Sequence, residues 1–205
     1  MKLFLASEAK YPESMQKLEK FVGGLKDKSI AYIPTAANGE DPYDDWRTNS
    51  STWNLVNTLR VNVTPVVLEE YKNSSVLEIF KGKDIIWVAG GMCGYLMYWM
   101  RRCEIDKHIR EILVDTVYVG SSAGSMIAGS SFYIEKPYEE IGADVIPGLG
   151  LVDFEIFPHY EDEMYELVKK NYKGSKIYLL KNGEAITVVE GRVKVLGEER
   201  IIIGQ

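Results

Sequence analysis

The chain has 205 residues, of which 46% are hydrophobic and 26% charged, a composition typical of a globular domain. Its formal charge of −6 and its lack of a basic run argue against nucleic acid or an anionic membrane as a partner. The first apolar run, Leu3 to Ala6, is too short for a signal peptide, and no segment approaches the ~20 apolar residues of a membrane span, so we expect a cytoplasmic protein.

Short apolar segments alternate with longer amphipathic segments through the first part of the chain. Runs rich in Val, Ile, Leu and Tyr predict buried strands at 2–6, 29–34, 64–70, 84–91 and 116–120. Apolar residues spaced three and four apart predict helices between them, at 11–25, 44–62, 75–82 and 94–115. Strands that alternate with helices favour an α/β fold, in which a mostly parallel sheet has helices on both faces.

The pattern changes after Pro147. A helix is predicted at 162–172, and apolar, strand-like segments lie at 151–157, 176–180, 184–191 and 192–203. We expect these late strands to be antiparallel and to close one edge of the sheet. Because no repeat, linker or low-complexity segment interrupts the chain, a single domain over residues 1–205 is predicted.

Small and polar residues gather where three predicted strands end, at 34–38, 88–94 and 119–125. Ligands of open α/β sheets bind beyond such carboxyl ends. Residues 120–124 match G-x-S-x-G, the pattern that raises a serine on a sharp strand-to-helix turn. The strained turn needs small neighbours. The spacing predicts Ser122 as a nucleophile, with Ser121 as the variable residue of the pattern.

A serine nucleophile needs a base, and the chain has two histidines. His108 lies in a highly charged segment, which favours a solvated helix face. His159 follows Pro158 at the end of an apolar run. We therefore predict His159 as the general base.

Four segments resemble the motifs of one known family. The motifs occur in the same order as in that family and extend over most of the chain. They are YVGSSAGSMIAG at 118–129, IIWVAGGMCGYL at 85–96, SIAYIPTA at 29–36 and IFPHY at 156–160. Together they resemble the dipeptidase E (aspartyl dipeptidase) family, of which cyanophycinases are more distant members. The resemblance implies a three-layer α/β/α sandwich similar to class I glutamine amidotransferases, and serine peptidase activity with Ser122 and His159. It also implies an oxyanion hole at Gly90, Gly91 and Ala123.

The third member of the family's catalytic triad is a Glu in a loop after the histidine. An alignment without gaps sets Asn182 at that position, with Glu184 two residues later. Asn182 would orient the imidazole as Asn does in papain-like sites, whereas a small shift of the loop would bring Glu184 in. Asp153 and Glu155 are weaker candidates, because acidic residues are expected on the outward face of an edge strand.

Like the residue at the third triad position, the residues expected to bind the substrate side chain differ from those of the family. The family's aspartyl dipeptidases hold an acidic side chain with cationic groups, including an Arg after the histidine, but 160–176 contains no Arg here. The acidic run 161–163 would repel an Asp side chain within a Debye length of ~8–10 Å. We therefore expect poor cleavage, or none, after an amino-terminal Asp. Glu135 is a candidate to bind a substrate amine.

No zinc-binding spacing and no phosphate-binding glycine loop is found, so no metal and no cofactor are expected. The two cysteines, Cys93 and Cys103, are expected to be reduced thiols. The expected partner is a small peptide substrate, and a homodimer is left open. Two alternatives remain: an amidase that depends on Cys93, since 89–95 is also a strand-to-helix turn, and a degenerate homologue that binds a ligand without cleaving it.

Overall fold

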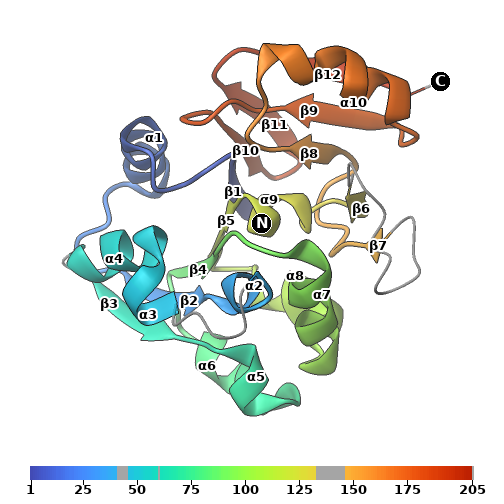
Figure 1. Ribbon diagram of the computed structural model, residues 1–205. Coiled ribbons are helices and arrows are strands. Elements are labelled where there is room, and N and C mark those ends of the chain that lie inside the picture. Colours follow the sequence, from blue (N-terminus) through green and yellow to red (C-terminus); the bar gives the residue numbers. More distant parts are fainter. Residues whose placement is uncertain (41–45, 60, 133–145, 205) are drawn as a thin grey trace.

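The computed structural model describes residues 1–40, 46–59, 61–132 and 146–204. Its largest element is a seven-stranded sheet (Figure 1). In order across the sheet its strands are β11 (Arg192–Leu196), β10 (Ala185–Val189), β1 (Lys2–Ala6), β5 (Val117–Ser121), β4 (Ile85–Val88), β2 (Ser29–Ile33) and β3 (Asn62–Pro65). The five strands from β1 to β3 are parallel, and β10 and β11 are antiparallel at one edge. The predicted fold class is thus confirmed.

Helices cover both faces of this sheet and complete three layers (Figure 1). One face carries α1 (Pro12–Val22), α3 (Trp46–Asn49) and α4 (Ser51–Thr58), and the other carries α5 (Leu68–Tyr71), α6 (Leu77–Phe80), α7 (Cys93–Arg102), α8 (Ile105–Ile112) and α9 (Ala123–Met126). The remaining short helices are α2 (Thr35–Asn38), η1 (Ser74–Val76), η3 (Asp162–Met164) and α10 (Tyr165–Asn171). Among the described residues, no helix is long and apolar enough to cross a membrane.

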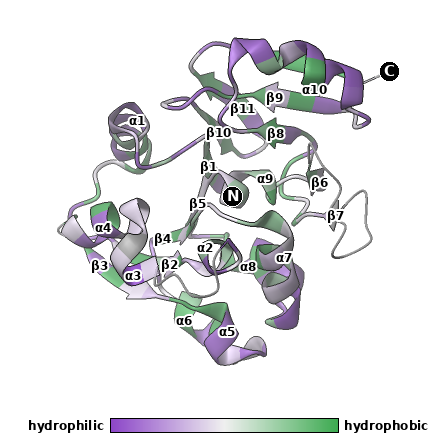
Figure 2. Cartoon of the chain, viewed as in Figure 1, coloured by the Kyte–Doolittle hydropathy of each residue, from purple (hydrophilic) through white to green (hydrophobic). Residues whose placement is uncertain are grey.

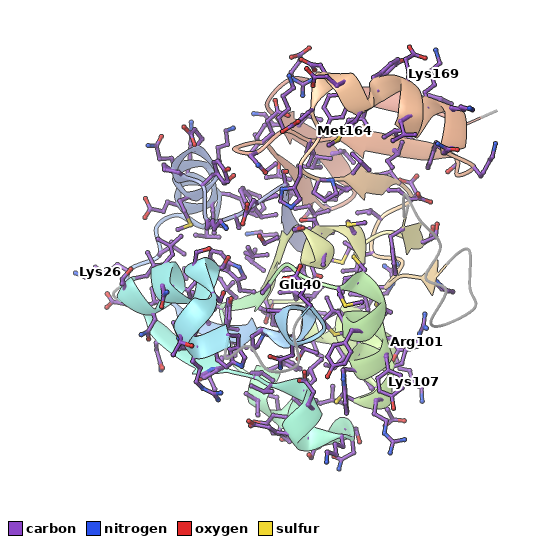
Figure 3. All side chains as sticks on the ribbon, in the orientation of Figure 1. Lys26, Glu40, Arg101, Lys107, Met164 and Lys169 are labelled. Carbon is purple, nitrogen blue, oxygen red and sulfur yellow. The ribbon has the colours of Figure 1, made fainter. Side chains whose placement is uncertain are left out.

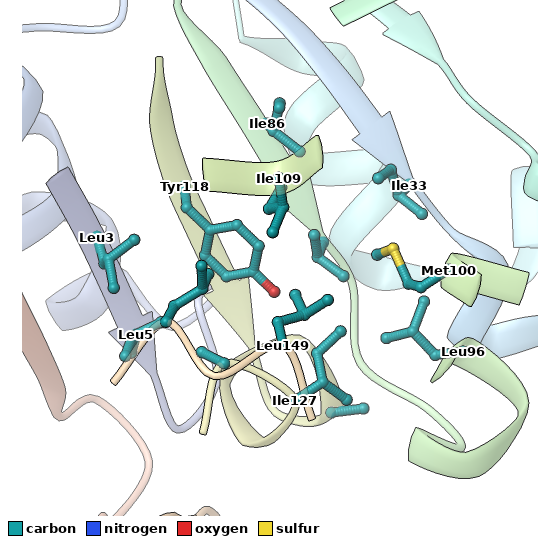
Figure 4. Close-up of a cluster of buried hydrophobic side chains, with 14 of the residues drawn as sticks. Leu3, Leu5, Ile33, Ile86, Leu96, Met100, Ile109, Tyr118, Ile127 and Leu149 are labelled. Atoms are coloured by element: carbon teal, nitrogen blue, oxygen red, sulfur yellow. The ribbon is translucent and has the colours of Figure 1, made fainter. Parts of the chain in front are cut away.

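The side chains of each central strand alternate between two hydrophobic cores. Leu3 and Tyr118 belong to the core on the side of α7 and α8, and Figure 4 shows them in one cluster with Leu96 and Met100. Phe4 belongs to the core on the α1 side. Hydrophilic residues lie mainly on the outer helices (Figure 2), and charged side chains such as Lys26, Lys107 and Lys169 project outward (Figure 3). Strands buried on both faces explain the nearly continuous apolar runs of the sequence.

The late strands differ in part from the prediction. Of the late strands that the structure describes, β10 and β11 alone close the edge of the main sheet. A separate three-stranded sheet contains β12 (Ile201–Ile203), β9 (Lys176–Leu179) and β8 (Glu155–Phe157), in which β8 and β9 are parallel. A third, two-stranded sheet pairs β6 (Ser131–Phe132) with β7 (Ile146–Pro147). The parallel pair arises because η3 and α10 connect β8 to β9, as a helical crossover connects parallel strands.

Several predicted element boundaries were wrong. The strand expected at 64–70 ends at Pro65, and α5 begins at Leu68. The helix expected at 94–115 is two helices, because Glu104 adopts a left-handed conformation with φ 59° that turns the chain between them. The helix expected at 44–62 is interrupted at Ser50, whose hydroxyl accepts a hydrogen bond from the Trp53 N–H and caps α4.

Candidate active site

The turn between β5 and α9 raises the side chain of Ser122. Its backbone has φ 50° and ψ −112°, which a residue other than glycine rarely adopts. A Cβ atom at Gly120 would lie 2.7 Å from the Gly124 carbonyl oxygen, so the strand and the returning helix pass close together. The Ser122 N–H donates to the carbonyl oxygens of Ala6 and Ser7, at 3.2 and 3.1 Å. This strained conformation is therefore held by the neighbouring strand β1.

His159 reaches Ser122 from the segment that follows β8. Its Nε2 atom lies 2.9 Å from the Ser122 Oγ atom. The histidine backbone is also left-handed, with φ 54°, and its N–H donates to the Ser7 Oγ atom at 2.8 Å. Two strained residues from distant parts of the sequence thus meet through their side chains.

Asn182 lies on the other side of the imidazole, in the loop between β9 and β10. Its Oδ1 atom is 2.8 Å from Nδ1 of His159, and its Nδ2 atom donates to the Tyr11 hydroxyl at 3.3 Å. Because an amide oxygen only accepts hydrogen bonds, it holds the proton on Nδ1. The lone pair of Nε2 then faces the Ser122 hydroxyl, as a general base requires.

Glu184, the other residue considered for this position, faces a different part of the molecule. Its carboxylate pairs with Arg200 at 2.8 Å and accepts the backbone N–H groups of Lys181 and Glu198, at 2.9 and 3.0 Å. These contacts tie the loop to the segment after β11.

Neither of the weaker acidic candidates contacts the imidazole within the described residues. Glu155 accepts a hydrogen bond from the Ser131 hydroxyl at 2.6 Å, and burial raises the pKa of its carboxyl group. Asp153 is exposed.

The glycine pair after β4 lies beside the serine. A Cβ atom at Gly90 would be 3.0 Å from the Ser122 Cβ atom. Gly91 has φ 132°, and a Cβ there would overlap the Ala36 backbone, so the position requires glycine. Among the described residues, the backbone N–H groups of Gly91 and Ala123 have no hydrogen-bond acceptor. Glu135 lies outside the described residues.

Cys93 lies in the same region but is not available for chemistry. It is the first residue of α7, its side chain is buried, and its Sγ atom contacts the Met126 sulfur at 3.5 Å. Burial raises the pKa of its thiol to about 12, so the thiol stays protonated at neutral pH. His108, at 3.4 Å from Glu111, lies on a partly exposed face of α8, as the sequence indicates.

Ser122 and His159 open onto a cavity of about 270 Å³. Among the described residues, its charged lining consists of Glu8, Lys10 and Glu40, the last of which follows α2 (Figure 3). The segment after β1, which supplies Ser7, Glu8 and Lys10, was not predicted as part of the site. The rule that ligands bind beyond the carboxyl ends of strands could have indicated it, because β1 pairs with β5 in parallel.

A serine hydrogen-bonded to an imidazole at the carboxyl edge of an α/β sheet is typical of serine hydrolases, in which the group behind the imidazole is usually a carboxylate and here is the amide of Asn182. The model of peptidase family S51 matches residues 3–196. The chain therefore belongs to this family and is a peptidase, and the predicted resemblance to dipeptidase E is confirmed.

Individual relatives cover most of the chain or nearly all of it. An uncharacterised peptidase of Pasteurella multocida is 28% identical in an alignment of 168 positions that covers 78% of this chain and 77% of that protein. Peptidase E of Haemophilus influenzae is 22% identical in an alignment of 223 positions, gaps included, that covers 99% of each protein. A crystal structure described as a peptidase E protein of Listeria monocytogenes has the same fold, with a TM-score of 0.74 and 24% identity over 95% of this chain and 96% of that one.

Proposed function

We propose that this peptidase hydrolyses dipeptides and short peptides through an acyl-enzyme on Ser122. The observation that carries the proposal is the line of hydrogen bonds from Ser122 through His159 to Asn182, at 2.9 and 2.8 Å. The Ser122 oxygen attacks the peptide carbonyl carbon while Nε2 of His159 takes the hydroxyl proton. When the C–N bond breaks, the imidazolium returns this proton to the leaving amine.

Deacylation reverses these roles with water as the nucleophile. His159 takes a proton from water, the hydroxide attacks the acyl carbon, and Ser122 leaves with the proton. The free N–H groups of Gly91 and Ala123 support the proposal that both donate to the oxyanion of each tetrahedral intermediate. Asn182 orients the imidazole, but a neutral amide stabilises the imidazolium less than a carboxylate would, so we expect a slow enzyme.

The cavity charges bear on the substrate. Lys10 is already paired with Glu8 at 2.5 Å, and the lining residues that the structure describes include no Arg. Glu40 adds a second carboxylate. The acidic run 161–163 does not line the cavity, and Asp162 pairs with Lys181 at 2.7 Å. The carboxylates that would repel an Asp side chain are therefore Glu8 and Glu40, and not that run. A cavity with this charge favours a free amine and a neutral or basic side chain over Asp.

Steady-state kinetics on three dipeptides test this proposal. We expect kcat/KM for Ala-Leu and Lys-Leu to exceed that for Asp-Leu by ~10-fold or more, the ratio that about 1.4 kcal/mol of differential binding produces. A strong preference for Asp-Leu would overturn the proposed specificity while leaving the serine mechanism in place. Activity that survives Ser122→Ala would overturn the mechanism itself.

A second candidate is a homologue that binds a peptide without cleaving it. One observation favours it, namely the amide of Asn182 where the family has a carboxylate. It predicts that dipeptides raise the melting temperature although no dipeptide of a broad panel is hydrolysed. Turnover of any dipeptide that requires Ser122 rules it out.

A further inference from the structure

Ser7 contacts all three residues of the proposed mechanism. It directly follows β1 and is fully buried. Its carbonyl oxygen accepts the Ser122 N–H at 3.1 Å. Its hydroxyl oxygen accepts the His159 N–H at 2.8 Å and donates its own proton to Oδ1 of Asn182 at 3.1 Å. Its backbone N–H donates to the Glu184 carbonyl oxygen at 3.0 Å, which fixes Ser7 against the loop that carries Asn182.

We infer that Ser7 is a positioning residue that selects the catalytic tautomer of His159 by orienting the amide of Asn182. The inference rests on the proposed function, in which His159 is a base. A carboxylate presents an oxygen to the imidazole in either orientation, whereas an amide presents either an oxygen or an NH₂ group. If the NH₂ group faced Nδ1, the ring proton would move to Nε2 and point at Ser122, and the imidazole could not accept the hydroxyl proton.

Loss of the correct tautomer has a large effect in enzymes of this class. Replacing the triad Asp of a serine protease with Asn lowers kcat by ~10⁴-fold, because the amide stabilises the wrong tautomer. An Asn at this position therefore requires a neighbour that keeps its oxygen toward the imidazole.

The Ser7 hydroxyl is such a neighbour because its hydrogen-bonding capacity is already partly used. It accepts the His159 N–H, and its single proton then needs an acceptor. Oδ1 of Asn182 is the only acceptor for this proton among the described residues. Rotating the amide by 180° would leave the buried proton unpaired. The Tyr11 hydroxyl, on the other side of the amide, can donate or accept and so does not distinguish the two orientations.

A double-mutant cycle tests whether Ser7 acts through the amide. Asn182→Asp replaces the amide with a carboxylate that cannot present an NH₂ group, while the contact of Ser7 with the His159 backbone is kept. We expect Ser7→Ala to lower kcat by ~10²-fold or more in the Asn182 enzyme, but by less than ~10-fold in the Asn182→Asp background. Equal losses in the two backgrounds would mean that Ser7 only supports the backbone, and the inference would be wrong.

Histidine ring ¹⁵N NMR gives a readout that does not depend on activity. The chain has only two histidines, so His108 serves as an internal reference. When the imidazole is neutral, we expect the proton of His159 on Nδ1 in the wild type, and wholly or partly on Nε2 in Ser7→Ala. A tautomer unchanged by Ser7→Ala would overturn the inference. If the tautomer shifts but the wild type cleaves no peptide, the proposed function fails while the role of Ser7 stands.

Two further variants serve as controls. Tyr11→Phe removes the contact that does not select an orientation, so it should leave both the tautomer and kcat nearly unchanged. If it moved the proton to Nε2, Tyr11 and not Ser7 would orient the amide. Should Ser7→Ala fail to fold, Ser7→Cys repeats the test, because a thiol of similar size is a weak donor. We expect Ser7→Cys to shift part of the His159 population to the Nε2 tautomer, and no shift would count against the inference.

Discussion

Two neighbouring strands, β4 and β5, each end in a turn of small residues that leads into a helix. After β4 the turn spans several residues, and α7 begins at Cys93 with its side chain in the core. After β5 the turn is the single residue Ser122, and α9 begins immediately after it. The thiol of Cys93 packs against Met126, whereas the hydroxyl of Ser122 lines the cavity and meets His159.

Backbone conformation, and not residue type, explains this difference. Cys93 has begun a regular helix, so its side chain joins the face that α7 buries, along with Leu96 and Met97. Ser122 belongs neither to the strand nor to the helix, and its φ of 50° turns its side chain away from the core. A turn of small residues is therefore not enough to identify a nucleophile, because the reactive residue must itself hold the strained position.

The largest expected effect separates the two turns by activity. Ser122→Ala removes the proposed nucleophile, so we expect kcat to fall by ~10³- to 10⁶-fold on the best dipeptide substrate. Cys93→Ala is the matched control at the neighbouring turn, and it should keep kcat within a few-fold of the wild type. Loss of activity in Cys93→Ala, in a protein that is still folded by circular dichroism, would reverse this comparison.

A second prediction concerns the contact between the two turns. A Cβ atom at Gly124 would overlap the carbonyl oxygen of Val88, the last residue of β4, so the elbow forms only if α9 can approach this strand. We expect Gly124→Ala to lower the free energy of unfolding by about 3 kcal/mol, measured by urea denaturation. Gly82→Ala is the control, since its Cβ meets no atom within 4 Å and its cost is the left-handed backbone alone, about 1 kcal/mol. Equal losses of unfolding free energy in the two variants would contradict the close approach of α9 to β4.

The alternation of strands and helices could be predicted because buried parallel strands leave short apolar runs in the sequence. Helix breaks could not, because the apolar spacing continues through Cys103 and the break depends on the left-handed backbone of Glu104. The parallel pairing of β8 with β9 was also missed, since the sequence of a short strand does not report the direction of its partner.

Within the site, the approach of His159 to Ser122 could be predicted because the chain offers only two histidines. The sequence left Asn182 and Glu184 as alternatives, since they share one loop. The partner of Glu184 is Arg200, which lies beyond the intervening hairpin of β10 and β11, so that ion pair could not be foreseen. Ser7 was not predicted either, because an isolated serine after a strand has no distinguishing pattern, and its importance lies in three contacts made through the fold.

The smallest expected effect is on thiol labelling. This experiment compares the two turns in the wild-type protein, without a substitution. With a pKa of about 12, the Cys93 thiol is ionised in only ~1 molecule in 10⁴ at pH 8, and Cys103 is also buried with a raised pKa. Iodoacetamide at pH 8 should therefore leave both cysteines unmodified by mass spectrometry and activity intact, while in denaturant both should react. Because the thiolate fraction rises with pH, any slow labelling of the native protein should accelerate toward pH 10. Rapid labelling of Cys93 at pH 8 with a parallel loss of activity would contradict the proposal. It would place the reactive group at the turn after β4 and not at Ser122.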